Sequence, residues 1–167
     1  MWLLFFVAVA VALFAYRSAT TTTVVLVRHA EKELVTIDDP PLAPTGERRA
    51  ERLAQMFGTA GGPGHIEGVY VTNTRRSQQT AAPLAARLGI RPSVLPAATS
   101  ADSVASQVLH EHRGGRALIV GHSNTVPEIV KALSGQVVPP IPDEEYDDVY
   151  VVTVPTFGRA SVLRLKY

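Results

Sequence analysis

Four apolar, β-favouring residues, Val24 to Val27, lead directly into Arg28 and His29. A continuous apolar run of this kind is typical of a strand that is buried on both faces of its sheet. Both faces are covered only where helices pack on each side, so this run strongly constrains the fold. The strand also delivers a guanidinium and an imidazole to the carboxyl edge of the sheet, where α/β proteins bind their ligands.

The rest of the chain alternates between predicted strands and predicted helices. Further strands are expected over 68–72, over 116–120 and, on the evidence of Val94 and Leu95 alone, around 93–95. Helices are expected after an N-cap at Thr45, over 75–88, over 101–113 with Ser100 as its cap, and after a cap at Asn124. Segments 148–154 and 160–167 alternate in polarity and predict a closing hairpin. We therefore expect an α/β fold, a three-layer α/β/α sandwich with a mixed, mostly parallel central sheet.

Composition narrows the possible functions of the chain. Its 167 residues, 46% of them hydrophobic, suit one globular domain. The net charge of +1 provides no global field for binding nucleic acid, so we expect no nucleic-acid partner. Because the chain has no cysteine, disulfides, thiolate catalysis and cysteine-ligated zinc are excluded.

Residues 2–16 carry no charged side chain. As a helix they extend about 22 Å, which suits a signal-peptide core or a short anchor. No well-spaced pair of small residues follows to form a cleavage site, so we expect an uncleaved signal-anchor. The chain then divides into a hydrophobic segment with a short linker, 1–22, and a catalytic domain, 23–167. The expected protein is membrane-anchored or exported, with the membrane as a partner; the sequence leaves open which side the domain occupies.

Polar groups follow three of the predicted strands at what should be one edge of the sheet. Arg28 and His29 follow the first strand, Thr72 and Arg76 follow the second, and His122 follows the third. Two arginines, two histidines and two helix N-termini at one edge favour a compact polyanion, with phosphate as the best candidate. The chain lacks a glycine-rich Walker loop, which argues against a nucleoside triphosphatase.

Four segments in this order resemble the histidine phosphatase superfamily, in the branch of the cofactor-dependent phosphoglycerate mutases and small phosphohistidine phosphatases. The segments are 26–31 (LVRHAE), 41–50 (PLAPTGERRA), 71–81 (VTNTRRSQQTA) and 120–125 (VGHSNT). The resemblance implies that His29 is the nucleophile that becomes phosphohistidine. It also implies that Arg28 and Arg76 bind the phosphate and that His122 contacts the transferring phosphoryl group.

Members of this family commonly use an acid that protonates the leaving group. Asp102 is the only carboxylate in the corresponding stretch, 94–102, and Glu31 is a second, weaker candidate. The chemistry is coherent with no cofactor and no metal, because arginines can stabilise the charge of a transferring phosphoryl group.

The expected function is a metal-independent phosphatase that hydrolyses a phosphomonoester or a phosphoramidate through a phosphohistidine on His29. A phosphoglycerate mutase-type phosphotransferase and a non-catalytic phospholigand-binding module are the alternatives. The chain looks too short for the cap that a mutase needs to retain its intermediate. The partner is then a phosphorylated substrate whose identity the sequence leaves open.

Overall fold

A computed structural model describes residues 2–19, 21–61 and 64–167 of the chain. Its six strands are β1 (Thr21–Arg28), β2 (Gly68–Thr72), β3 (Ser93–Leu95), β4 (Arg116–Gly121), β5 (Asp148–Pro155) and β6 (Ser161–Lys166). Its helices are α1 (Trp2–Ala19), α2 (Pro44–Phe57), α3 (Arg75–Leu88), α4 (Ala101–Glu111) and α5 (Thr125–Ser134).

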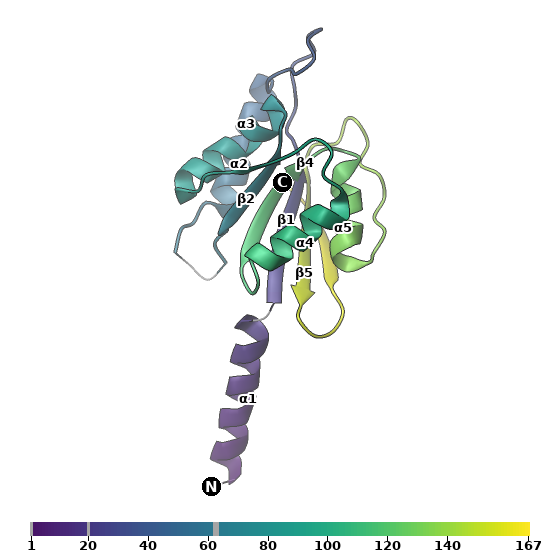
Figure 1. The fold of residues 1–167 in the computed structure, drawn as a ribbon. Helices are drawn as coiled ribbons and strands as arrows, with labels where there is room; N and C mark the ends of the chain where they lie inside the picture. Colours follow the sequence, from purple (N-terminus) through teal and green to yellow (C-terminus); the bar gives the residue numbers. More distant parts are fainter. Residues whose placement is uncertain (1, 20, 62–63) are drawn as a thin grey trace.

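The strands form one sheet in the order β3-β2-β4-β1-β5-β6. The first four of these pair in parallel, whereas β5 and β6 add to β1 as an antiparallel hairpin. The carboxyl ends of β1, β2 and β4 therefore meet at the same edge, and Figure 1 shows this edge at the end of the sheet opposite the β5–β6 turn. The prediction of a mixed, mostly parallel sheet is confirmed.

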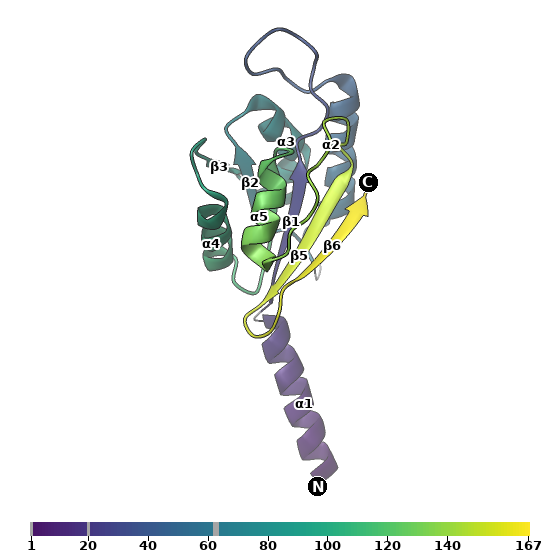
Figure 2. The same cartoon turned by 90° about the vertical axis from the view of Figure 1, so that its right-hand side faces the viewer.

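Helices cover both faces of the sheet, as the apolar run of β1 predicts (Figure 2). Val24 and Leu26 face a core that includes α4 and α5, whereas Val25 and Val27 face a core that includes α2 and α3. Successive residues of a strand point to opposite faces, so a strand buried on both sides must be apolar at every position. The three-layer α/β/α sandwich is confirmed.

The structure places one predicted N-cap residue elsewhere and shows no capping hydrogen bond for a second. Helix α2 begins at Pro44 with Ala43 as its N-cap residue, so Thr45 lies inside the first turn. Proline suits the first position of a helix because its φ is already helical and because the N–H that it lacks would have no acceptor within the helix. The residue at the N-cap of α5 is Asn124, as expected, but its side chain makes no capping hydrogen bond. Ser100 caps α4 as predicted, accepting a hydrogen bond from the backbone N–H of Ser103.

The prediction of a membrane-anchored or exported protein, with 1–22 as a signal-anchor, is wrong. Helix α1 has 18 residues and rises about 27 Å, short of the roughly 30 Å hydrocarbon core of a bilayer. Among residues 2–19, 21–61 and 64–167, no helix combines the length and the apolar character that a membrane span requires. The division of the chain between residues 22 and 23 stays a prediction.

Candidate active site

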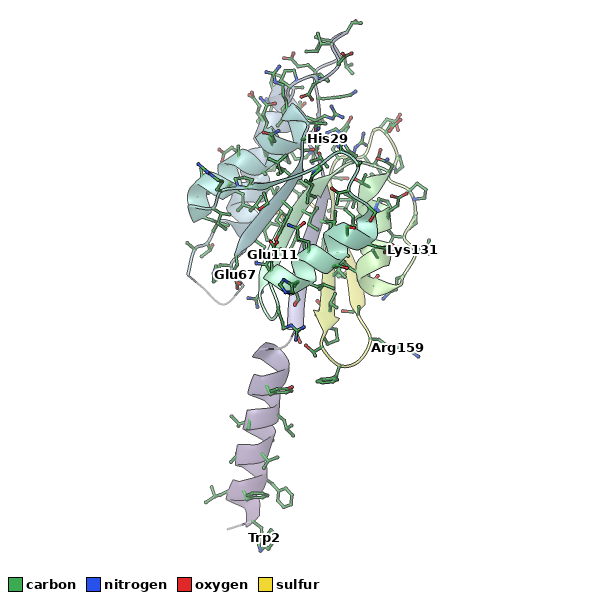
Figure 3. The ribbon with its side chains drawn as sticks, in the orientation of Figure 1. Trp2, His29, Glu67, Glu111, Lys131 and Arg159 are labelled. Atoms are coloured by element: carbon green, nitrogen blue, oxygen red, sulfur yellow. The ribbon has the colours of Figure 1, made fainter. Side chains whose placement is uncertain are left out.

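The register between β1 and β4 brings two histidines side by side. Arg28 pairs with Gly121, so the residues that follow, His29 and His122, leave neighbouring parallel strands at the same level. The backbone N–H of His29 donates to the carbonyl of Gly121 at 2.9 Å, which extends the ladder by one bond. The two imidazole rings lie 5.2 Å apart between centroids, at the upper end of the sheet where Figure 3 labels His29.

His29 is buried and held in one tautomer. Its Nδ1 lies 2.8 Å from the carbonyl oxygen of Ala30, and a carbonyl can only accept, so Nδ1 carries the proton. Burial lowers the pKa of His29 to about 3; the bond to Ala30 opposes this, and the charges of His122, Arg76 and Arg28 add to it. The ring is therefore neutral near pH 7, and its Nε2 lone pair is available as a nucleophile.

His122 is fixed by a chain of hydroxyl groups. Its Nε2 lies 3.0 Å from Oγ1 of Thr72, and the Thr72 hydroxyl donates to Oγ of Ser77 at 2.7 Å. Because the Thr72 proton is used on Ser77, Nε2 of His122 is the donor to Thr72. Burial, followed by the charges of Arg76 and Arg28, lowers the pKa of His122 to about 4, so this ring is also neutral near pH 7.

Arg28 is buried and reaches the loop before β5. Its Nη1 donates to the carbonyls of Pro142, Asp143 and Glu145 at 2.8–3.0 Å. Its guanidinium carbon lies 4.2 Å from the ring centre of Tyr146, within cation–π distance. Nε of Arg28 is buried without a hydrogen-bond partner among the described residues. An unsatisfied guanidinium N–H at this depth is costly unless an acceptor binds there.

Arg76 lies in the first turn of α3 and also has a buried Nε without a partner in the described structure. Its Nη1 lies 3.5 Å from Oδ1 of Asp39. Both carboxylate oxygens of Asp39 accept from the backbone N–H of Arg75, at 2.9 and 3.1 Å. Asp39 thus occupies a helix N-terminus and one face of an arginine, two groups that attract anions.

The hydroxyl group of Thr80 connects the segment that follows β1 to the first turn of α3. Its buried hydroxyl accepts from the backbone N–H of Ala30 at 2.9 Å and donates to the carbonyl of Arg76 at 2.7 Å. One side chain therefore sets the distance between the segment that carries His29 and the turn of α3 that carries Arg76.

The two predicted proton donors lie in other surroundings. Glu31 forms a two-pronged ion pair with Arg49, at 2.7 and 2.9 Å. Partial burial of Glu31 opposes ionisation, but the hydrogen bonds of Arg49 prevail and lower the pKa of Glu31. Glu31 is therefore a carboxylate near pH 7, and its contacts are those of a structural clamp. Asp102 is exposed in the first turn of α4, and it does not line the cavity beside His122.

Three residues of the site were not among the sequence candidates: Asp39, Thr80 and Tyr146. Asp39 and Tyr146 come from loops that precede α2 and β5, and no local pattern indicates where such loops fold back. Thr80 belongs to the segment that carries the family resemblance, but its hydroxyl contacts depend on how α3 lies beside the segment that follows β1.

One group of carboxylates in the described residues has the spacing of metal ligands. Glu145, Asp147 and Asp148 lie with their oxygens within 4.8 Å of one another. Arg164 and Lys166 pair with these oxygens at 2.7–3.3 Å, so each of the three carboxylates already has a cationic partner. We assign no metal to this group.

Comparisons with known proteins agree with this geometry. Residues 24–99 match the family model of the histidine phosphatase superfamily, branch 1. No curated protein sequence matches the chain significantly.

Two solved structures of related fold cover most of the chain. A structure of the protein histidine phosphatase SixA, complexed with tungstate, has a TM-score of 0.69 and 21% identity over 86% of this chain and 96% of its own. A mycobacterial glucosyl-3-phosphoglycerate phosphatase has a TM-score of 0.61 and 14% identity over 80% of this chain and 90% of its own. The family match over residues 24–99 and the fold shared over most of the chain confirm the predicted resemblance to the histidine phosphatase superfamily.

Proposed function

We propose that this protein is a phosphatase that hydrolyses a phosphomonoester or a phosphoramidate through a phosphohistidine on His29. One observation carries the proposal: a buried, neutral imidazole, with its proton on Nδ1, lies near two arginines whose Nε donors have no partner in the part of the chain that the structure describes. The structurally similar protein histidine phosphatase SixA was solved in complex with tungstate, which is a tetrahedral oxyanion like phosphate. That likeness supports an oxyanion site here.

In the proposed first step, Nε2 of His29 attacks phosphorus in line and the bond from phosphorus to the leaving group breaks. Arg28 and Arg76 stabilise the charge on the equatorial oxygens. His122 adds a donor, because its protonated Nε2 can turn from Thr72 to a phosphoryl oxygen. In the second step water attacks the phosphohistidine, and His29 and inorganic phosphate are released.

Glu31 is tied to Arg49 and Asp102 lies outside the cavity beside His122, so neither is assigned as the acid. A substrate whose leaving group needs little protonation, such as an acyl phosphate, a phosphohistidine or an aryl phosphate, therefore suits the first step. The arginines carry the electrostatic stabilisation, and the proposed mechanism routes no step through a metal.

The test is to trap the intermediate with ³²P-labelled acetyl phosphate. The wild type should take up a label that is stable in alkali and lost in acid, as expected for phosphohistidine, and should release phosphate. His29→Ala should abolish both. His110→Ala, which alters an exposed histidine of α4, should change neither.

Two other outcomes would overturn the proposal. Efficient interconversion of monophosphoglycerates in the presence of a bisphosphoglycerate would show a mutase instead. Tight binding of phosphate by both the wild type and His29→Ala, with no label and no hydrolysis, would show a phospholigand-binding module.

A further inference from the structure

A cavity of about 270 Å³ opens beside His122, at the carboxyl ends of β2, β3 and β4. Its apolar wall consists of Leu95, Pro96, Ala97, Val104, Ile119 and Ile129. Four of these six side chains are buried members of the core between the sheet and the helices α4 and α5. The wall of the cavity is therefore formed mainly by side chains of the packed core.

The cavity shares two residues with the candidate active site. His122 and Thr72, which are joined by a hydrogen bond of 3.0 Å, line its wall. In an in-line displacement the leaving group departs on the side of phosphorus opposite the nucleophile. If His29 attacks from one side, the leaving group lies on the opposite side of the phosphorus. His122 lines the cavity, so the cavity is adjacent to the place where the leaving group would lie.

The residues that line this cavity include no aspartate, glutamate, lysine or arginine. Its polar groups are neutral hydroxyls and amides, such as those of Thr99, Asn73 and Asn124, and the neutral ring of His122. A carboxylate or a second phosphate placed here would meet only the partial positive charge at the N-terminus of α5 and no cationic side chain, which does not offset the loss of water around a full charge. An apolar group would gain the contacts of the aliphatic wall.

Size limits the occupant further. An apolar cavity of about 150 Å³ is enough to hold benzene. A hollow of about 270 Å³ with a polar rim therefore suits a group of one or two rings that carries a hydrogen-bonding atom.

We propose that the substrate is a phosphomonoester of a small, uncharged, largely apolar phenol, which leaves with little protonation and whose organic part occupies this cavity. The inference rests on the proposed phosphatase activity and adds the class of leaving group to it.

The first test compares 4-tolyl phosphate with 4-carboxyphenyl phosphate, which differ by a methyl group against a carboxylate of similar size. The carboxylate draws electrons and makes the better leaving group, so chemistry alone favours the second substrate. We expect kcat/KM to be at least ten-fold higher for 4-tolyl phosphate, because the cavity rejects the charge. Equal values, or a preference for the carboxylate, would overturn the inference.

The second test fills the cavity with a side chain. Ala97→Trp alters an exposed residue of the wall, and Ala98→Trp is the matched control at the next exposed position, outside the wall. Ala97→Trp should lower kcat/KM for 2-naphthyl phosphate about ten-fold and leave that for acetyl phosphate within two-fold. Ala98→Trp should change neither. Equal effects of the two variants would refute the assignment of the cavity.

The activities separate failure of this inference from failure of the proposed function. Hydrolysis of acetyl phosphate without discrimination between the aryl phosphates refutes the inference alone. Absence of all hydrolysis above the His29→Ala level refutes the proposed function and the inference with it. Hydrolysis of a phosphotyrosine peptide more than ten-fold faster than that of 4-tolyl phosphate would overturn the inference and indicate a phosphoprotein substrate.

Discussion

At the scale of single residues, backbone atoms prepare the side chains for chemistry. The carbonyl of Ala30 selects the tautomer of His29, and the carbonyls of residues 142, 143 and 145 hold Arg28. Such contacts need no reorganisation when a substrate arrives, which is the condition for effective electrostatic stabilisation. The Nε atoms of Arg28 and Arg76 have no hydrogen-bond partner within residues 2–19, 21–61 and 64–167, and in the proposed mechanism the phosphoryl group supplies one.

Thr80 gives a test of this preparation, because its hydroxyl joins Ala30 to Arg76. Thr80→Val keeps the shape but leaves the buried N–H of Ala30 without its acceptor, which costs about 1–3 kcal/mol. We expect a lower free energy of unfolding by urea denaturation and a lower kcat. Thr80→Ser restores the hydroxyl and should recover most of both; a serine variant as impaired as the valine variant would contradict this explanation.

At the scale of elements, the approach of α2 to the segment after β1 sets the position of the site. A Cβ added at Gly46 would lie 2.2 Å from the backbone carbonyl oxygen of Glu31. The same carbonyl accepts from the backbone N–H of Ala43 at 2.8 Å, and the Glu31 side chain pairs with Arg49 of α2. Helix α2 is thus attached two residues after His29 by a backbone contact and by an ion pair.

Gly46→Ala should therefore destabilise the protein. In an open helix this change gains roughly 1 kcal/mol, but the clash with backbone costs about 1–3 kcal/mol because neither atom can rotate away. We expect the clash to prevail, lowering the midpoint of thermal unfolding and displacing His29 enough to reduce activity. Gln55→Ala on the exposed face of α2 is the control and should stay within about 0.5 kcal/mol of the wild type. A more stable Gly46→Ala variant would show that the helix can shift freely.

At the scale of the whole molecule, the topology decides which charges meet. Strand order β2-β4-β1 gathers Thr72, His122 and His29 at one edge, although they come from positions spread over nearly a hundred residues. Folding moves both histidines from water into buried, positively charged surroundings. Their pKa values fall from 6.5 to about 3 for His29 and about 4 for His122. The folded protein therefore binds fewer protons than the unfolded chain between these values and 6.5.

Stability should consequently fall as the pH is lowered from 7 towards 4.5. In this range the unfolded histidines take up protons that the folded ones refuse, so protonation favours unfolding, by about 1 kcal/mol or more for His29. The buried carboxylates, with lowered pKa values, add to the loss only at lower pH. Chemical denaturation at several pH values would measure the slope. His29→Asn should flatten it and His110→Asn should not; an unchanged slope in His29→Asn would refute the buried neutral state.

The sequence by itself determined the local features of this protein. Apolar runs and helix periodicity predicted most elements and the sandwich, because both depend on which residues are near in the chain. The same local signal predicted a signal-anchor over residues 1–22. That prediction is wrong, because helix α1 lacks the length and apolar character of a membrane span. It also predicted that Arg28, His29, Arg76 and His122 lie at one edge of the sheet, since strand ends can be located from the apolar runs that precede them; their catalytic roles stay a prediction.

Only the tertiary structure decided how these groups are used. The pairing of Arg28 with Gly121 in the register between β1 and β4 places the imidazoles of His29 and His122 side by side. The loop before β5 folds back, and its carbonyls accept hydrogen bonds from Arg28. Packing of α2 brings Arg49 to Glu31, and the loop that precedes α2 brings Asp39 to Arg76. Each of these contacts joins residues distant in the chain, and their formation depends on the packing of the whole domain.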